Sequence, residues 1–563
     1  MTCDAKGNLR YRTSVTTAAI VLMAGSYLTM SGTTAKTEPR ESGAEAGKDE
    51  NWITALSSES AAASQSVGKR ENETVVPKQY LGANVDDADK SNAAKEDGKK
   101  AKARKKEKST EGAFRSDPQY AHKYDAKEQS DIYGGKTAIE PPRPLLELGR
   151  EQYTSGIYDE SSTIFGKLNP LLPGLSVYGD WRTAIAYNRN NGKDIAQVAT
   201  RLNLDVDFKL TATERIHAFF TPLQDGNAKF TRFEFGGRDG DQKFNGEFDF
   251  TPQVLYFEGD AGSIYSGMTG QHAGFDLPFT VGLFPLFLQN GIWANDAILG
   301  GAVTLPARNS AALGLSNFDV TFFAGFDNID NASFVKANGK VDNNNANLFG
   351  VTTFADAFNG YVEAGYGFLQ GTGVQAGVEQ HFLTAAYTRR YANTISNSTR
   401  VFANFGEDGH GNGDGVALIS ENSLITSLPS TLLPYANFFI GAGNPEPLVD
   451  GNNAGILKNV GINFETDALT GYPKLDDTAS NTFGGALGVQ YLFNLDQQLV
   501  FEVATVQPFE NDNIGAKGAQ YGFGARYQIP LTRSWLFRAD ATYQIQEGAE
   551  DNFGFRTELR SKF

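Results

Sequence analysis

The side chains with the widest catalytic use in this sequence are its histidines, and their spacing does not predict an enzyme. The five are His122, His217, His272, His381 and His410. None lies in an HExxH motif, beside a second histidine or near a nucleophile elbow. The chain also lacks a phosphate-binding loop with Lys and Ser or Thr, and a dinucleotide-binding fingerprint. We therefore predict no catalytic residue and no cofactor.

The residues that could bind a metal are few. Cys3 is the only cysteine, so a processed chain would have no disulfide, no thiol nucleophile and no metal site with cysteine ligands. The glycine-rich segment 405–415 has oxygen ligands that suit calcium, namely Glu407, Asp408, Asn412 and Asp414. Their spacing does not match an EF-hand loop, and acidic glycine-rich loops are common on protein exteriors. This is a weak calcium candidate, and no other metal site is predicted.

Charged side chains that alternate with apolar ones indicate a sheet with one wet face. From 201 to 210, every second residue is leucine, valine or phenylalanine, and four of the intervening residues are charged. Burying such ions in a dry core costs several kcal/mol for each imperfectly paired one, so this face must meet water. The same argument predicts a water-facing position, which in a barrel would be a lumen-facing and transport-related one, for Arg182, Arg201, Asp205, Asp207, Lys209, Arg526, Arg538, Asp540, Arg556, Glu558 and Arg560.

The last residues of the chain show the same alternation and end on an aromatic residue. In 553–563 one parity is mostly apolar, whereas the other carries Arg556, Glu558, Arg560 and Lys562. A soluble domain gains nothing from an apolar aromatic at a frayed terminus. The pattern resembles the closing strand of bacterial outer-membrane β-barrels, and this resemblance implies an assembly signal made of Phe553, Phe555, Leu559 and Phe563.

Many further segments predict strands, with short and long connections in turn. Outside the extreme N-terminus no apolar run approaches the roughly 20 residues of a membrane helix, so any bilayer crossing must use strands. The region 173–563 accommodates roughly 16 to 18 strands, and we favour 16. Candidates with soft boundaries lie at 177–188, 202–210, 229–237, 243–250, 253–259, 297–306, 317–326, 346–355, 360–369, 382–391, 399–405, 456–464, 483–493, 520–529, 535–545 and 553–563.

One stretch breaks the alternation. Residues 277–293 are apolar on both parities and contain two prolines, which sheets confine to edges and bulges. A closed barrel has no edge strand. We expect part of this stretch to fold inward or pack at the rim as a constriction, with Phe284, Pro285, Phe287 and Gln289 as its candidates. An irregular lipid-facing strand pair with bulges at the prolines is an equally good interpretation.

The N-terminal third differs in composition from the rest. Residues 1–35 have a basic n-region followed by an apolar stretch and small residues, which predicts a signal peptide. Residues 36–136 are poor in apolar side chains and include the basic block 99–108, which predicts a disordered segment. Residues 137–172 predict a connector or plug at the periplasmic mouth, with a short helical turn at 145–153.

The charge is uneven along the chain. Residues 1–172 contain 25 Lys and Arg and 25 Asp and Glu, whereas residues 173–563 contain 25 against 41, so this part holds 25 − 41 = −16, the whole net charge. A basic nucleic-acid-binding footprint is absent from the strand-rich region. An acidic lumen would favour cations mildly.

In its alternation, aromatic content and final Phe563, the region 173–563 resembles bacterial outer-membrane porins. The resemblance does not identify a subfamily. It implies an all-β fold, a transmembrane antiparallel β-barrel in the outer membrane, contact with membrane lipid and with the barrel-assembly machinery, and possible assembly as a homotrimer. The function it implies is passive diffusion of small hydrophilic solutes or ions.

Three other functions stay open at this stage. The barrel could be a structural anchor whose N-terminal basic segment binds the cell wall. It could be the sheath of a porin–cytochrome electron conduit, although this chain has no haem-attachment motif and would need a separate cytochrome. It could also be a barrel enzyme that depends on a single histidine. Negligible conductance, a cytochrome partner, or hydrolysis lost on changing one histidine would distinguish them.

Overall fold

We analysed a computed structural model of the chain. It describes residues 143–149, 162–164 and 166–563, except 227–228, 237–242, 313, 337–340, 408–412, 429–430, 452–454, 466–468, 494–496 and 510–514. The predicted signal peptide and low-complexity segment lie outside these residues, and the predicted connector 137–172 is described only in part. No helix within the described residues is long and apolar enough to cross a membrane.

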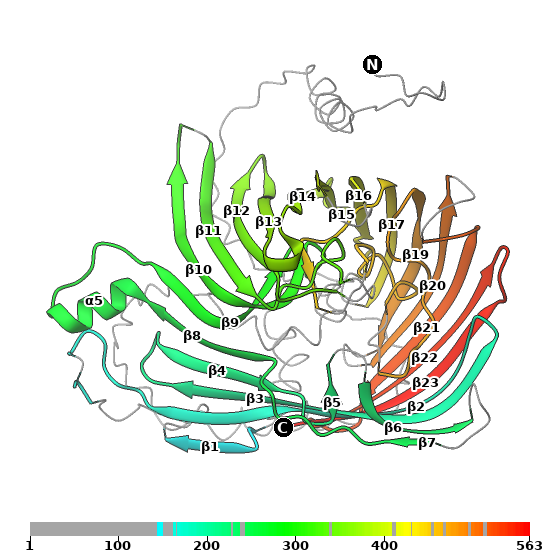
Figure 1. Ribbon diagram of the computed structural model, residues 1–563, viewed down its shortest axis with the longest axis horizontal. Helices are drawn as coiled ribbons and strands as arrows, with labels where there is room; N and C mark the ends of the chain where they lie inside the picture. Colours follow the sequence, from blue (N-terminus) through cyan, green and yellow to red (C-terminus); the bar gives the residue numbers. More distant parts are fainter. Residues whose placement is uncertain are drawn as a thin grey trace, which may run out of the picture.

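The described chain forms a closed antiparallel barrel of 18 strands (Figure 1). Each wall strand pairs antiparallel with its neighbours, and the last strand pairs with the first, from Asp180↔Lys562 to Arg189↔Phe553. The wall strands are β2 (Gly174–Asn190), β3 (Lys193–Lys209), β4 (Arg215–Phe220), β8 (Val254–Asp260), β9 (Pro278–Leu288), β10 (Ala294–Ser310), β11 (Leu315–Asp327), β12 (Ala346–Ala357), β13 (Gly360–Gly371), β14 (Glu379–Tyr391), β15 (Ile395–Glu407), β16 (Gly415–Leu424), β17 (Leu432–Gly443), β19 (Thr482–Phe493), β20 (Gln497–Pro508), β21 (Gln520–Pro530), β22 (Trp535–Gln546) and β23 (Asn552–Lys562).

The remaining elements are short. They are β1 (Leu146–Gly149), β5 (Gln224–Asp225), β6 (Lys229–Gly236), β7 (Lys243–Asn245), β18 (Val449–Asp450), the helix α5 (Ala261–Thr269) and the single 3₁₀ turn Gly373–Gln375. β1 extends the sheet at the start of β2. β6 pairs with the part of β3 that β4 leaves free, and β7 pairs with β6.

Side-chain alternation explains why these segments form a barrel wall. In β22, Arg538, Asp540 and Gln544 are buried inside, whereas Tyr543 and Ile545 are exposed on the outer face. An apolar outer face and a polar inner face are what a strand between lipid and a wet lumen requires. The prediction of an all-β, transmembrane antiparallel barrel is confirmed by this arrangement.

Tight turns connect the strands at several points. β2 passes into β3 through Asn191 and Gly192, whose φ angles are 49° and 73°. These left-handed values are those of a two-residue hairpin turn of type I′, for which an Asn-Gly pair is strongly preferred. We call this end of the barrel the outer end, and the end that holds β1 and Phe563 the inner end.

Phe563 lies in the seam between the last strand and the first. Its amide donates to the Gly179 carbonyl at 3.0 Å, and the Gly179 amide donates to the Phe563 carbonyl at 2.8 Å. The terminal residue therefore continues the ladder that closes the barrel.

The barrel interior contains three inward-folded segments from its outer end, 289–293, 328–345 and 444–481, which together we call the plug. The plug contacts opposite walls. β18 pairs with β10, and the Thr470 carbonyl accepts hydrogen bonds from Asn188 on β2 at 2.6 Å and from Gln197 on β3 at 2.5 Å. The interior is therefore not filled by water alone.

Three sequence-based expectations need correction. The favoured number of 16 strands is too low, and the alternative of 18 is the observed one. The expected strand at 456–464 is part of the plug, where Ile456, Leu457, Val460 and Phe464 are fully buried. The expected helical turn at 145–153 is not helical over Leu146–Gly149, which forms β1, because these residues find a free ladder beside the start of β2.

Candidate functional site: the barrel lumen

A group of charged side chains covers the inner face of the neighbouring strands β21, β22, β23, β2, β3, β4 and β8. We call it the charged belt, and it comprises Asp180, Arg182, Asp205, Asp207, Arg215, His217, Glu258, Arg526, Arg538, Asp540, Arg556, Glu558 and Arg560.

Asp540 is the centre of the first part of the belt. Its carboxylate accepts hydrogen bonds from Arg526 at 2.7 Å, Arg538 at 2.8 Å and Arg556 at 2.8 Å. Arg526 also donates to Glu465 of the plug at 2.9 Å. Alternation along β21, β22 and β23 turns these side chains to the same inner face, and the strand register brings Arg526 and Arg556 opposite Asp540. Three guanidinium groups thus share two carboxylates.

The second part of the belt spans the closing seam. Arg182 on β2 donates two hydrogen bonds to the carboxylate of Glu558 on β23, at 3.2 and 2.9 Å. Arg560 lies 3.3 Å from Glu558 and 3.7 Å from Asp180. A bidentate arginine–carboxylate pair is among the stronger and more directional ion pairs. The seam is therefore held by side chains as well as by the backbone.

The third part of the belt is richer in acids. His217 on β4 lies between two carboxylates of β3, with Nε2 3.3 Å from Asp205 and Nδ1 3.0 Å from Asp207. Arg215 pairs with Glu258 on β8 and lies 3.5 Å from Asp207. His217 therefore lies on the polar inner wall of the barrel, between the carboxylates of Asp205 and Asp207.

Within the belt, two acids keep the largest exposed fractions. The side chains of Asp180 and Asp207 are 20% and 21% exposed. Arg215, which lies beside Asp207, is 16% exposed, whereas Arg182, Arg556 and Arg560 are only 6%, 2% and 5% exposed. The accessible part of the belt is therefore the part around Asp180, Asp207 and Arg215.

Polar contacts fix one side of the plug to the wall. The buried carboxylate of Glu502 on β20 accepts hydrogen bonds from the backbone amides of Ile462 and Asn463, both at 2.9 Å, and from the Tyr435 hydroxyl at 2.5 Å. Asn437 on β17 donates to the Val460 carbonyl at 2.6 Å. These bonds satisfy backbone groups of an irregular segment that would otherwise be buried without partners.

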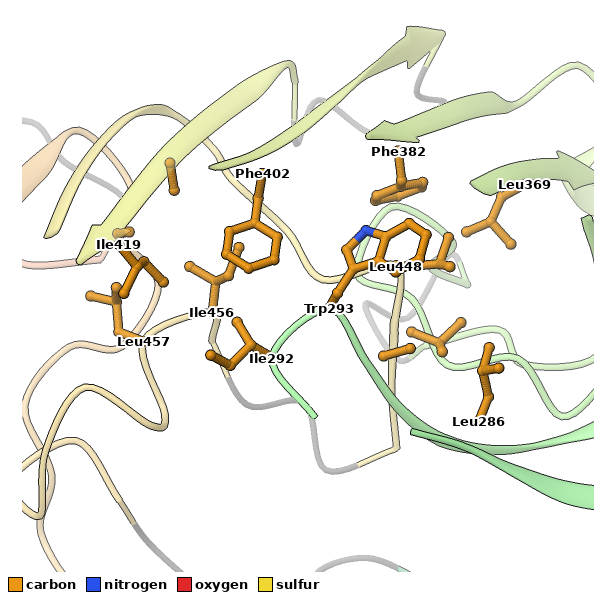
Figure 2. Close-up of a cluster of buried hydrophobic side chains, with 14 of the residues drawn as sticks. Leu286, Ile292, Trp293, Leu369, Phe382, Phe402, Ile419, Leu448, Ile456 and Leu457 are labelled. Atoms are coloured by element: carbon orange, nitrogen blue, oxygen red, sulfur yellow. The ribbon is translucent and has the colours of Figure 1, made fainter. Parts of the chain in front are cut away.

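Apolar contacts fix the other side of the plug. Trp293 lies beside Leu448, with Phe382 and Leu369 of the wall on one side and Phe402 on the other (Figure 2). All five are buried, and the cluster extends to wall residues of β12 to β17. The lumen wall therefore has an apolar sector on β12 to β17 and a charged sector formed by the belt, and the plug contacts both.

Two carboxyl groups in the plug have raised pKa values. Burial and the neighbouring Asp450 raise the pKa of Asp330 to about 6. Burial and the neighbouring Asp477 raise the pKa of Asp476 to about 6. Burial acts against ionisation of Asp342 as well, yet hydrogen bonds from Asn345 and Gln375 hold its pKa below the usual value. The plug therefore contains groups that titrate close to neutral pH.

The structure places the predicted lumen residues as follows. Arg182, Asp205, Asp207, Arg526, Arg538, Asp540, Arg556, Glu558 and Arg560 belong to the charged belt. Arg201 is partly buried and donates to Asn203 at 2.8 Å, and Lys209 is exposed at the inner end of β3. Their part in transport stays a prediction.

The predicted constriction residues belong to a wall strand and the turn that follows it. Phe284 is buried against the plug, whereas its neighbour Pro285 is only partly buried. Gln289 begins the turn, with a φ angle of 50°, and Ile292 and Trp293 after it enter the plug. Because residues 285–288 belong to the wall strand β9, deleting 285–289 would break the wall as well as alter the lumen. Such a deletion could not distinguish a constriction from a structural role.

The other predicted residues are only partly described. Asp408 and Asn412 of the weak calcium candidate lie outside the described residues, as does the side chain of Glu407, and Asp414 accepts from the Gly406 amide at 3.2 Å. Among described residues, no group of three or more His, Cys, Asp or Glu side chains could hold a metal. Phe555 and Leu559 lie on the outer face, and the role of the terminal residues in assembly stays a prediction.

Sequence reasoning missed the segment 444–481 as the main inward element, and with it Glu465 and Glu502. One signal was present. The segment contains Leu448, Val449, Leu457, Val460 and other apolar residues at a density that an external hydrophilic loop does not need.

No protein-family model matches the chain, and no curated protein matches it. Solved structures with a similar fold include OpdO of Pseudomonas aeruginosa (11% identity, TM-score 0.44, 69% of this chain and 97% of that chain). They also include OccK2 (OpdF) of Pseudomonas aeruginosa (8%, 0.45, 69% and 97%). A third is a BenF-like porin of Pseudomonas fluorescens Pf-5 (10%, 0.48, 69% and 98%).

The fold class follows from the chain's own pairing and from the two faces of its wall. The ring of antiparallel strands closes on itself, and its outer face is apolar while its inner face is largely polar or covered by the plug. In its fold the chain is a porin-type outer-membrane β-barrel of 18 strands.

Proposed function

We propose that the protein is an outer-membrane channel for passive diffusion of small hydrophilic solutes or ions, with a mild preference for cations. The observation that carries the proposal is the charged wall of the lumen. The plug packs on the apolar wall of β12 to β17 and also contacts β2, β3 and β21. Polar solutes would therefore follow the part of the charged belt on β2, β3, β4 and β8, where Asp180, Asp207 and Arg215 keep exposed side-chain surface. An 18-stranded barrel is wide enough for such a path beside an internal segment.

The cation preference is supported by two features. The region 173–563 has a net charge of 25 − 41 = −16. Within the belt, the exposed fractions of Asp180 and Asp207 exceed those of Arg182, Arg556 and Arg560. A low-dielectric wall strengthens the effect of accessible lumen charges on passing ions.

Planar-bilayer recordings of the purified protein test the proposal. We expect discrete conductance steps and, in a salt gradient, a reversal potential of the sign for cation preference. A reversal potential that favours anions would contradict the cation preference alone. Absence of conductance from correctly folded protein would contradict the channel itself.

A further inference from the structure

The pairing between β8 and β9 stops halfway along β9. The ladder runs from Asp260↔Pro278 to Leu255↔Leu283 and ends there. The rest of β9, residues 284–288, pairs with β10 but with no other segment of the described chain. We call the boundary between residues 246–253 and 284–288 the seam; it is separate from the closing seam between β2 and β23.

A proline helps to explain why the ladder does not extend. Beyond Val254 and Phe284, the register of β8 and β9 would bring Gln253 opposite Pro285 and Pro252 opposite Leu286. Proline has no amide hydrogen, so Pro252 could not donate to the Leu286 carbonyl as a regular ladder requires. The Gln253 amide donates to the Phe219 carbonyl at 2.9 Å, on the other side of its strand.

A closed barrel is expected to have no edge strand, yet the outer half of β9 is a local edge because residues 284–288 pair only with β10. Pro285 occupies it, which agrees with the restriction of prolines to sheet edges. Unpaired backbone groups that face lipid are unfavourable. The amide and carbonyl groups along this edge therefore need hydrogen-bond partners, either from water or from a bound molecule.

Apolar side chains line both sides of the seam. On the lipid side, the rings of Phe248 and Phe250 lie 5.0 Å apart and are 78% and 54% exposed. On the lumen side, Phe284 and Leu286 are buried in the same cluster as Trp293. Figure 2 shows Leu286 near Trp293 in the plug cluster. Segment 246–253 therefore carries apolar side chains on the outer face, and segment 284–288 carries them toward the interior.

One buried polar group directly follows segment 284–288. Gln289 directly follows β9 and is 7% exposed, and within the described chain neither its amide nitrogen nor its amide oxygen has a hydrogen-bond partner. A buried amide without partners is unfavourable, and it can both donate and accept. A hydroxyl or another neutral amide would satisfy both atoms.

We propose that the seam is a lateral opening through which amphipathic molecules with one alkyl chain and a small uncharged polar head pass between the bilayer and the barrel interior. The alkyl chain lies between the phenylalanines of the two sides, and Gln289 binds the head. This route is separate from the path of polar solutes along the charged belt.

Fluorescence quenching tests the opening. The probe is an ω-bromo derivative of undecanol, because bromine quenches a tryptophan that it contacts. Trp181 and Trp535 face lipid and are quenched by any partitioned probe, so the signal of interest is the difference between the native protein and Trp293→Phe. We expect this Trp293 component to be quenched saturably and to recover when unbrominated undecanol is added in excess.

Two further variants test the route and the head group. Pro252→Thr/Pro285→Thr removes both prolines and restores the donor of residue 252 that would face β9, so the ladder can extend and quenching should become at least about tenfold slower. Pro434→Thr, a strand proline far from the seam, is the matched control and should leave the rate unchanged. Gln289→Leu should weaken binding about tenfold, which corresponds to about 1.4 kcal/mol.

The proposal is overturned if Trp293 shows no saturable quenching, or if the double variant is quenched as fast as the native protein. Equal affinity in Gln289→Leu would overturn the role of the amide. Each variant is first checked for a folded barrel by its resistance to unfolding in cold detergent, and Pro252→Thr alone replaces the double variant if that one does not fold. Ion conductance is recorded in parallel, so that failure here is distinct from failure of the channel proposal.

Discussion

Asp540 is the residue on which most of the arginine charge in the lumen depends. It accepts from Arg526, Arg538 and Arg556, all of which are buried with it. Removing one partner of a buried ionic group leaves an uncompensated charge, which is much more costly than the intact group is stabilising. The arginines also contact the plug, where Arg526 donates to Glu465 and Arg556 lies over the Tyr472 ring.

We therefore predict that Asp540→Asn destabilises the barrel by about 3 to 5 kcal/mol, measured by unfolding in urea in the presence of lipid. It should also shift ion selectivity toward anions, because one negative charge is lost among three positive ones. The control is Asp551→Asn, since Asp551 makes an exposed hydrogen bond with Tyr543 and its loss should cost less than about 1 kcal/mol. Equal stabilities of the two variants would refute the argument.

The accessible acids carry a separate prediction. Asp180→Asn/Asp207→Asn removes the two belt carboxylates with substantial exposed surface, so the cation-to-anion permeability ratio should fall toward one. The ratio is measured from reversal potentials in a potassium chloride gradient. Asp194→Asn, on an exposed pair with Arg189 at the outer end, is the control and should change the ratio little. An unchanged ratio in the double variant would place selectivity elsewhere.

At the scale of elements, the plug is held by packing on one side and by hydrogen bonds on the other. Trp293 is the largest fully buried side chain of the described residues and connects the turn after β9 to the plug and the wall. A packed tryptophan contributes much of its stability through contacts that surrounding residues cannot recover when it is removed. The plug should therefore loosen before the wall does.

Trp293→Ala should destabilise the plug by about 3 to 5 kcal/mol and raise the mean single-channel conductance. Trp181→Ala is the matched control, since Trp181 faces lipid and its removal leaves the lumen unchanged. Conductance and its noise are recorded for both variants in the same bilayer. If Trp293→Ala conducts like the native protein, the plug does not limit ion flow.

The raised pKa values of Asp330 and Asp476 predict that the stability of the plug depends on pH. A carboxyl group whose pKa is about 6 in the folded plug and lower in the unfolded state costs stability when it is ionised, above about pH 6. Protonation on acidification removes this cost. The plug should therefore become more stable as the pH falls from 8 to 5, and conductance should fall with it.

Hydrogen exchange of the amides in 444–481, corrected for the intrinsic pH effect, measures this stability. Asp330→Asn/Asp476→Asn should show slow exchange at both pH values, because the ionised form no longer exists. Asp342→Asn should behave oppositely and loosen the plug at neutral pH, since its carboxylate is stabilised by Asn345 and Gln375. Faster exchange of the native plug at pH 5 would contradict the assignment.

At the scale of the whole molecule, the barrel is a ring that the chain terminus closes. The backbone of Phe563 makes two hydrogen bonds with Gly179, so the terminal residue has a structural role that does not require its ring. We predict that Phe563→Ala keeps the stability of the folded barrel but lowers the yield of assembled protein in the outer membrane. A truncation that removes residue 563 should affect both. If Phe563→Ala assembles normally, the aromatic ring is not an assembly signal.

The ability to predict strands from the sequence depended on what each strand faces inside. β2, β3, β22 and β23 were found because their inner residues are charged and stand out from an apolar outer face. β16 and β17 were missed because their inner residues, such as Ile419 and Phe439, pack on the plug and are as apolar as the outer ones. Two-residue alternation is clearest where the lumen is wet, although β12 to β15 were found despite inner residues such as Leu348 and Phe382 that pack on the plug.

The sequence by itself determined the class of fold, because charged and apolar residues that alternate along many short segments are stable only in a sheet between oil and water. It also determined the closing role of the last strand and the end of the β8–β9 ladder, where a proline removes a donor. Only the tertiary structure decided what fills the barrel. The burial of Leu448 or Trp293, and the pairing of Arg526 with Glu465, depend on loops that fold back across the lumen. Such contacts join residues far apart in the chain, and no local pattern specifies which wall they meet.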